Sequence, residues 1–173
     1  MRKVRTYSKD EAFVANRRSH IIRSAARVIG RKSFKQVTMH ELAEACAMSK
    51  GNLYHYFGSK YDILSMIVDY AISHGFRAVE SALPELEEME PAQALVHAIS
   101  VWYSCMAENR QILNMIVREW ITLPRTTKTQ FLNRMRWVHS IFQNILERGS
   151  KGGVFCVENP ELVAMNISYL GYM

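Results

Sequence analysis

Two short helices joined by a tight turn constrain this chain more than any other feature of its sequence. Thr38 is placed to cap a predicted helix over 40–47, and Ser49 to cap a second one over 50–57. Threonine and serine are favoured at such positions because their side-chain oxygens accept hydrogen bonds from unpaired N–H groups of the first turn. Segment 38–57 therefore predicts a helix-turn-helix, a motif whose second helix enters the major groove of DNA.

The second of these helices has two unlike faces. Leu53 and Phe57 share one face on a helical wheel, where they would pack on the first helix against Leu42, Ala43 and Cys46. The opposite face and its flanks carry small, amide, imidazole and phenol groups, namely Gly51, Asn52, His55, Tyr54 and Tyr56. Such groups suit base edges and phosphates.

Helix N-termini in the same region are expected to bind phosphate, because free N–H groups and the helix dipole favour an anion there. Ser49 and Lys50 lie at the start of the second helix, and Thr38 and Lys60 lie at the starts of its neighbours. The charge distribution agrees with this prediction. Residues 1–60 hold 13 Lys and Arg against 4 Asp and Glu, whereas residues 61–173 hold 9 against 12. Such asymmetry indicates a polyanion-binding end, with an ordinary solvated basic surface as the alternative.

Helical periodicity continues through the rest of the chain, and no strand or internal repeat is predicted. Pro84 and the acidic run after it indicate a loop or a solvated helix end, and Gly149, Gly152 and Gly153 are expected to break the chain. Ser8 with Glu11 forms a capping-box pattern for the first helix. The expected helices are 9–30, 40–47, 50–57, 60–82, 91–108, 111–122, 125–148 and 160–173. The predicted fold class is all-α.

Segment 21–64 resembles the TetR family of bacterial transcriptional regulators. The resemblance centres on Val37-Thr38, on Leu42-Ala43-Glu44 and on the nearly gap-free block 49–60, SKGNLYHYFGSK. The chain departs from the family pattern at a few positions. Ala47 stands where the family usually has Gly in the turn, Met48 where it has Val, and Ser33 where a Gly precedes the aromatic residue. Asn52 replaces the commoner Thr or Ser, a change that would alter base preference.

The resemblance implies about nine helices in two parts. A DNA-binding head would span 8–60, with its recognition motif at 38–57, and a ligand-binding and dimerisation body would span 61–173. Two subunits would pair through their last two helices and bind a palindromic operator in double-stranded DNA. The final predicted helix reaches the chain end without a stop signal, so we expect a last helix to be missing. The family's DNA-contacting positions fall on Thr38, Ser49, Lys50, Gly51, Asn52, Tyr54, His55, Tyr56 and Lys60. Capping or packing is the simpler role for several of these.

The body is rich in aromatic residues and in methionine, a residue that repacks readily around varied ligands. Candidate effector-binding residues are Trp102, Tyr103, Met106, Met115, Arg118, Glu119, Trp120, Arg134, Met135 and Val138, with His139 as a further polar group. An ordinary apolar core is the simpler interpretation. Internal ion pairs, Arg118 with neighbours of Glu119 or Arg134 with Glu119, are the alternative for the charged residues. The body also resembles, more weakly, TetR members that sense acyl-CoA thioesters and related lipids, which implies a hydrophobic effector and no cofactor.

Two other classes of function were weighed. An enzyme is disfavoured because no nucleotide-binding or nucleophile motif is present, and His40-Glu41 lacks the second histidine of a zinc-protease helix. A constitutive architectural DNA-binding protein would explain residues 1–60 but not the aromatic body. Three widely spaced cysteines and an N-terminus without an apolar signal region indicate a cytosolic protein, and no segment reads as a membrane span.

Overall fold

The computed structural model describes residues 11–170, apart from some side chains, and within that range every regular element is a helix. The all-α prediction is therefore confirmed. The elements are α1 (Glu11–Arg31), α2 (Met39–Ala45), α3 (Lys50–Tyr56), α4 (Lys60–Gly75), α5 (Arg77–Glu88), α6 (Pro91–Glu108), α7 (Arg110–Arg118), a 3₁₀ turn (Trp120–Thr122), α8 (Arg125–Lys151) and α9 (Pro160–Leu170). The expected capping of the first helix by Ser8 lies outside the described residues.

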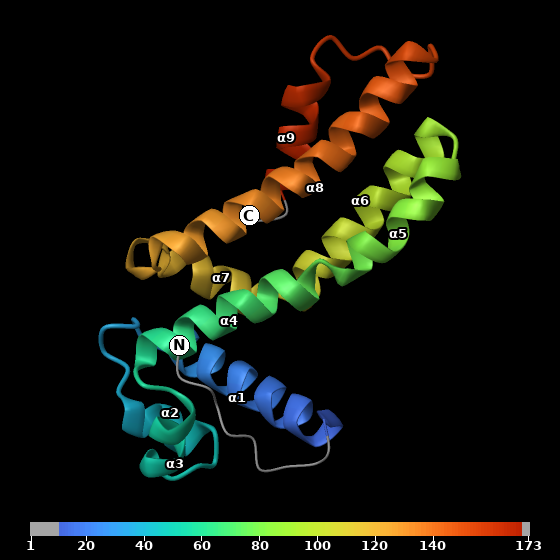
Figure 1. The fold of residues 1–173 in the computed structure, drawn as a ribbon. Coiled ribbons are helices and arrows are strands. Elements are labelled where there is room, and N and C mark those ends of the chain that lie inside the picture. Colours follow the sequence, from blue (N-terminus) through green and yellow to red (C-terminus); the bar gives the residue numbers. More distant parts are fainter. Residues whose placement is uncertain (1–10, 171–173) are drawn as a thin grey trace.

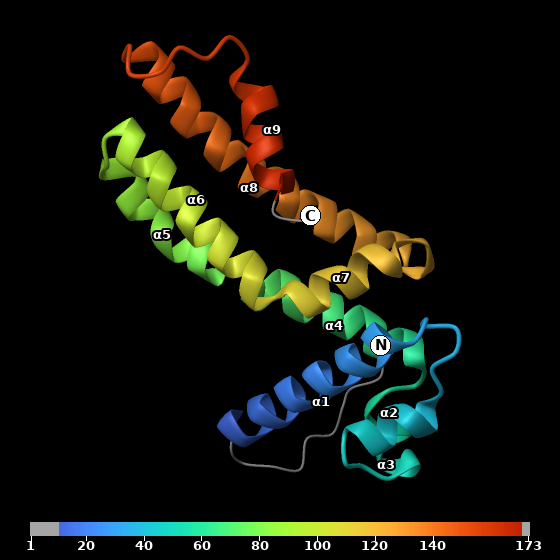
Figure 2. The ribbon, with the colours of Figure 1, turned by 180° about the vertical axis from the view of Figure 1, so that it is seen from behind.

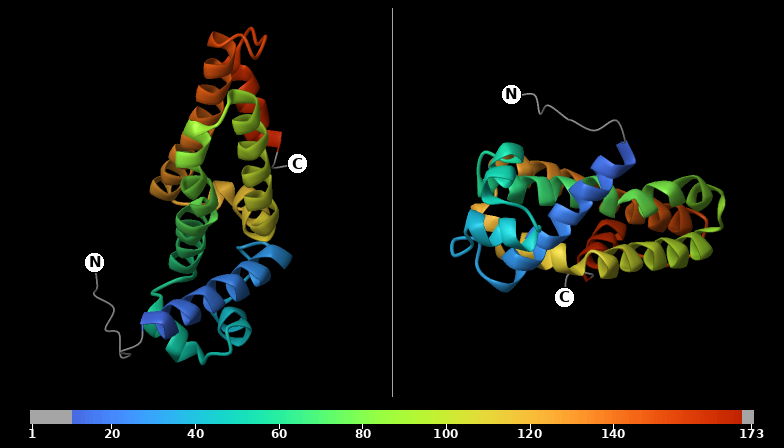
Figure 3. Two further views of the ribbon diagram at one scale, coloured as in Figure 1. Left: turned by 90° about the vertical axis from the view of Figure 1, so that its right-hand side faces the viewer. Right: turned by 90° about the horizontal axis from the view of Figure 1, so that it is seen from below.

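The helices form a small head and a larger body (Figure 1). The head comprises α1, α2 and α3, and α4 leads from it into the body. In the body α5 packs beside α6, and α8 packs beside α9. Seen from behind, α7 runs between these two pairs and lies against α1 of the head (Figure 2). The two further views show the body rising from the head as a splayed arrangement of helices (Figure 3).

Most predicted helix starts are confirmed because their signals are local. Ser59 accepts a hydrogen bond from the Asp62 backbone N–H at 3.3 Å, and its own N–H donates to the Asp62 carboxylate at 2.9 Å. Pro91 opens α6 as predicted, where its missing N–H costs nothing. The predicted helix over 160–173 begins at Pro160 and is described as far as Leu170.

Two predicted boundaries in the body are wrong. The helix expected over 60–82 ends at Gly75, and after the buried Phe76 a separate helix, α5, runs through Pro84 to Glu88. Pro84 therefore lies inside a helix and not in a loop, and the acidic run after it forms an exposed helix end, the second of the two predicted alternatives. Arg148 of α8 holds the end of this helix, donating to the carbonyl oxygens of Leu86, Glu87 and Met89 at 3.0, 2.7 and 2.8 Å. These bonds satisfy carbonyls that a helix end leaves without partners.

The helix predicted to end at Arg148 continues through Gly149 to Lys151. The Gly149 carbonyl accepts hydrogen bonds from the N–H groups of Val154 and Phe155, at 2.8 and 3.2 Å, as the chain turns back toward α9. A Cβ at Gly149 would lie 2.2 Å from the Phe155 ring. Gly149 is thus a packing position against the return loop, while the chain reversal falls at Gly152 and at Gly153, whose φ is +72°.

The end of α1 and the connection that follows it, together residues 29–37, are held by charged side chains from α4 and from the end of α7. Arg118, at the end of α7, donates to the carbonyl oxygens of Ile29, Gly30 and Lys32, the last two at 2.6 and 3.1 Å. Glu119 is 6% exposed and accepts from the Phe34 backbone N–H at 3.0 Å and from Arg118 Nε at 3.2 Å. We call Arg118 and Glu119 the α7 clamp, because they fasten the head to the body.

Lys60 holds the same connection from the opposite side. Its ammonium group donates to the carbonyl oxygens of Phe34, Lys35 and Val37 at 2.9, 3.2 and 3.1 Å. It also lies 4.7 Å from the centre of the Phe34 ring, which is completely buried and packs edge-on against Tyr61 at 5.0 Å. Cation–π attraction and hydrogen bonding therefore act together on one lysine.

We expect Arg118→Met to loosen the head on the body. The change removes three donors to the end of α1 and leaves the buried Glu119 carboxylate with one partner, which should cost about 1–3 kcal/mol of unfolding free energy. Amide hydrogen exchange at Phe34 should accelerate, because the Glu119 carboxylate that accepts from the Phe34 N–H is no longer held by Arg118. Arg125→Met, at an exposed arginine of α8, is the matched control. Equal exchange at Phe34 in both variants would contradict the role of the clamp.

The turn between α2 and α3 has a backbone that suits glycine better than the residue present. Ala47 has φ +51°, in the left-handed region that non-glycine residues seldom adopt. Its N–H donates to the Glu44 carbonyl at 3.0 Å, and the Met48 N–H donates to the Ala43 carbonyl at 2.9 Å. These two bonds form a Schellman motif, which normally places glycine at this position.

Ala47→Gly should therefore stabilise the protein by about 0.5–1 kcal/mol, because it relieves the left-handed strain and Ala47 is exposed. Ala45→Gly, two residues earlier in α2, is the control and should destabilise by about 1 kcal/mol. Denaturant unfolding measures both changes. A loss of stability on Ala47→Gly would show that the turn is not under strain.

Candidate nucleic-acid interface

The helix-turn-helix predicted over 38–57 is present, and its caps have the expected geometry. Thr38 Oγ1 accepts from the Glu41 N–H at 3.2 Å, and the Thr38 N–H donates to the Glu41 carboxylate at 2.9 Å, which completes a capping box. Ser49 Oγ accepts from the Asn52 N–H at 3.1 Å and caps α3. Both hydroxyls therefore fix the two helices in addition to any contact with phosphate.

Glu41 has a strongly perturbed carboxyl group. Its hydrogen bond to Lys32 and those to the Thr38 backbone and side chain lower its pKa to about 2. The group is thus ionised at neutral pH and complements the N-terminal dipole of α2. Lys32 joins the end of α1 to the start of α2 through this ion pair.

The second helix of the motif presents the predicted outward face. Leu53 is fully buried and Phe57 is half-buried against the core. Lys50, Gly51, Asn52, Tyr54 and Tyr56 are exposed, Tyr54 and Tyr56 by 46% and 47%. A Cβ at Gly51 would meet nothing within 4 Å, so the absence of a side chain leaves room for a close approach. The side chain of His55 lies outside the described part of the chain.

Two lysines of the predicted set differ in their surroundings. Lys50 Nζ lies 5.9 Å from the centre of the Tyr54 ring, on the exposed face of α3. The ammonium of Lys60, by contrast, is occupied by the three carbonyls of the α1–α2 connection. The ammonium group of Lys60 therefore stabilises the head, and a contact of this residue with DNA would involve the backbone N–H groups at the start of α4.

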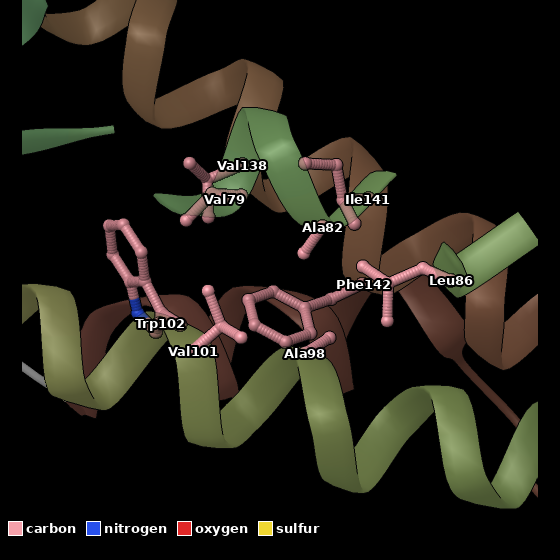
Figure 4. Close-up of a pocket in the computed structure, with 9 residues that line it drawn as sticks. All are labelled: Val79, Ala82, Leu86, Ala98, Val101, Trp102, Val138, Ile141 and Phe142. Atoms are coloured by element: carbon pink, nitrogen blue, oxygen red, sulfur yellow. The ribbon is translucent and has the colours of Figure 1, made fainter. Parts of the chain in front are cut away.

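The predicted effector residues do not converge on one site. Trp102 and Val138 line an apolar cavity between α5, α6 and α8 (Figure 4). The remaining lining residues are Val79, Ala82, Leu86, Ala98, Val101, Ile141 and Phe142. Its free volume is about 10 Å³, room for one water molecule at most. The sequence predicts helix at Val79 and Ala82, within 60–82, but no local signal indicates that they and Leu86 line a cavity.

A larger hollow of about 540 Å³ lies between α4 and α8. Its walls include Arg134 and Trp137 of α8 and Asp69, Ile72 and Ser73 of α4. The Arg134 guanidinium lies 4.0 Å from the Trp137 ring and forms an ion pair with Glu80. Its Nε is buried and has no hydrogen-bond partner. Arg134 is thus the one predicted effector residue whose charge faces an open volume.

The other predicted effector residues lie elsewhere in the fold. Arg118 and Glu119 form the α7 clamp. The alternative of internal ion pairs therefore applies to the charged residues, but the partners differ from those predicted: Arg118 pairs with Glu119 itself, and Arg134 pairs with Glu80. Tyr103 is partly exposed and donates from its hydroxyl to the Ile167 carbonyl at 3.4 Å. Core packing accounts for the rest: Met106, Met115, Trp120 and Met135.

Among residues 11–170 no group of three His, Cys, Asp or Glu side chains is arranged to hold a metal ion. No helix in that range is long and apolar enough to cross a membrane. Cys46, Cys105 and Cys156 are free thiols, and burial together with the nearby Glu108 charge raises the pKa of Cys105 to about 11.

Comparison with known proteins places these features in a family. Residues 21–67 match the family model "Bacterial regulatory proteins, tetR family", and residues 88–171 match "Tetracyclin repressor-like, C-terminal domain". A curated relative, the HTH-type transcriptional repressor KstR2 of Rhodococcus jostii, is 24% identical over 84% of this chain and 71% of its own. The alignments with the first three curated relatives span only 36%, 37% and 45% of those proteins.

Solved structures share the fold. The TetR-family regulator PfmR of Thermus thermophilus superimposes with a TM-score of 0.78 at 26% identity, over 88% of this chain and 81% of its own. AibR, solved with isovaleryl coenzyme A and operator DNA, superimposes with a TM-score of 0.65 at 23% identity, over 87% and 81%. Head and body are both matched by models of one family, and this chain belongs to the TetR family of bacterial regulatory proteins.

Proposed function

We propose that this protein is a ligand-responsive repressor that binds a palindromic operator as a homodimer and leaves it when a small hydrophobic effector binds. The observation that carries the DNA-binding part is the exposed face of α3, with Lys50, Gly51, Asn52 and Tyr54 on a buried Leu53. The positive charge of residues 1–60 supports it, because phosphate neutralisation supplies much of DNA affinity. In this proposal residues 8–60 form the DNA-binding domain and 61–173 the effector and dimerisation domain.

The α4–α8 hollow is the proposed entrance for the effector. The Arg134 guanidinium, whose Nε has no hydrogen-bond partner, would donate to an anionic head group, and the adjoining apolar body would hold a hydrocarbon chain. Because the cavity between α5, α6 and α8 is almost filled, a chain could enter only if these helices separate. A fatty acid or an acyl-CoA fits these requirements, and the coenzyme A thioester bound by AibR supports this class.

The proposed dimer face is formed by α8 and α9. Leu162, Met165 and Tyr169 of α9 are 49%, 42% and 52% exposed, and Val154 before it is 48% exposed. Large apolar side chains gathered at one surface are typical of a subunit interface.

Selection of bound duplexes from a random library, followed by titration at several salt concentrations, tests DNA recognition. Lys50→Ala should weaken binding to all sequences about fivefold and lower the salt dependence by about one charge, whereas Asn52→Ala should relax sequence preference. Lys151→Ala, at the end of α8, is the control. Equal affinity for any duplex would favour an architectural protein, and absence of binding would reopen the case for an enzyme.

Native mass spectrometry of the purified protein tests the effector class. A co-purified fatty acid or acyl-CoA should be found, and adding it should release the selected operator. Arg134→Gln should weaken this ligand about tenfold, the value of one charged hydrogen bond, and leave operator affinity without ligand unchanged. Arg125→Gln is the control. A polar ligand without an acyl chain would contradict the proposal.

A further inference from the structure

A third hollow, distinct from the two in the body, lies at the junction of head and body. Its volume is about 650 Å³, and it is enclosed by α1, α4 and the turn between α6 and α7. The polar groups that matter in its walls are Arg23, Arg27, Tyr70, His74, Glu108 and Arg110. This volume is within the range of small-molecule sites and much larger than an inorganic ion needs.

The charge of this hollow is unbalanced. Arg23 and Arg27 lie one turn apart on α1, and Arg110 faces them from the start of α7, with Glu108 as the one carboxylate among the lining residues. None of the three arginines has a hydrogen bond or ion pair with the described residues, whereas Arg118, Arg134 and Arg148 are all bound to carbonyls or carboxylates. Three exposed guanidinium groups from two elements thus line one hollow, and none of their donors bonds to the described residues.

The backbone at the start of α7 adds to this potential. Residues 109–112 line the hollow, and Asn109 makes no side-chain cap, because its amide donates instead to the Cys105 carbonyl at 2.9 Å. The first N–H groups of α7 and the positive end of its dipole therefore add to the arginine charges, although α6 ends at the same Asn109 and its negative end reduces the dipole contribution. Both favour a multiply charged anion.

One wall carries a flat aromatic surface. The rings of Tyr70 and His74 stack with their centres 4.2 Å apart and their planes 16° from parallel. His74 Nδ1 lies 3.3 Å from the Tyr70 carbonyl, which fixes the imidazole beside the phenol ring. Because each ring covers one face of the other, a planar ligand ring would extend the stack from the outer face of the exposed His74 ring while its phosphate met the arginines.

We propose that this hollow binds a phosphate-bearing small molecule of the nucleotide type, held by Arg23, Arg27 and Arg110 between head and body. A phosphate has enough oxygens to engage all three guanidinium groups, whereas a single carboxylate has only two. The occupant would bridge α1 and α7, the same pair of helices that the α7 clamp joins at its other end. Its effect would be to favour one orientation of the head, whatever the effector in the body does.

The arginines are not arranged to serve the DNA face. The hollow is lined by α1, α4 and the turn between α6 and α7, and none of its described lining residues belongs to α2 or α3. A role in binding the DNA backbone is therefore a distinguishable outcome of the test.

Isothermal titration of the full chain with ADP, pyrophosphate and adenosine tests the proposal. ADP should bind, pyrophosphate should bind more weakly, and adenosine should show no measurable binding. Arg27→Gln and Arg110→Gln should each weaken ADP binding about tenfold, with unchanged thermal unfolding in the absence of ligand. Arg77→Gln, at an exposed arginine of α5, should leave ADP affinity within twofold of the unsubstituted chain.

Three results would overturn the site. The first is absence of ADP binding at millimolar concentration, and the second is an equal loss of affinity in Arg77→Gln, which would indicate binding to general surface charge. The third is that Arg27→Gln and Arg110→Gln bind a random DNA duplex more weakly but bind ADP with unchanged affinity, which would indicate that these arginines contact DNA. ADP binding and DNA binding are measured separately. A negative result for the nucleotide site therefore leaves the proposed DNA-binding function testable, and the reverse holds as well.

Discussion

The structure depends on how the backbone between α1 and α2 is satisfied. The buried N–H of Phe34 and the partly buried carbonyls of Ile29, Phe34 and Val37 would otherwise lack partners, a cost that folded proteins avoid. Arg118, Glu119 and Lys60 supply the missing partners from α7 and α4, and they do so around a fully buried Phe34 ring. Since α2 and α3 follow directly, the position of the recognition helix depends on side chains that lie outside α1, α2 and α3.

In this arrangement the short helix α7 contacts α1 near both of its ends. Its C-terminal end holds the connection after α1, and its N-terminal end faces α1 across the arginine-lined hollow. α4 also contacts α1, and it forms one wall of the α4–α8 hollow. Any movement of α4 or α7 within the body must therefore either carry α1 along or break the clamp, which is the physical requirement for coupling two distant sites.

The sequence predicted those parts of the fold that depend on near neighbours. The caps at Thr38, Ser49 and Ser59 each join residues three apart, and the facing of Leu53 follows from helix geometry alone. The predictions that were wrong concern side chains whose partners lie far along the chain. Arg118 and Glu119 were assigned to a ligand because nothing local shows that their partners lie 85 or more residues away.

The same limit explains the errors in the body. Proline in a helix interior normally ends or kinks the helix, so Pro84 indicated a loop. The end of α5 is instead secured by Arg148, some 60 residues later, so the chain stays helical through Pro84 to Glu88 and Leu86 joins Val79 and Ala82 at the apolar cavity.

The long reach of the clamp also has a consequence for the order of assembly during synthesis. The head comes first in the chain, and its helices can form as soon as residues 11–60 are available. Its connection after α1 still lacks Arg118 and Glu119 until α7 has emerged, because the contacts span 85 to 89 residues. Long-range contacts of this kind form late, since the loop between them must first be closed. The part of the protein made first is therefore among the last to be completed.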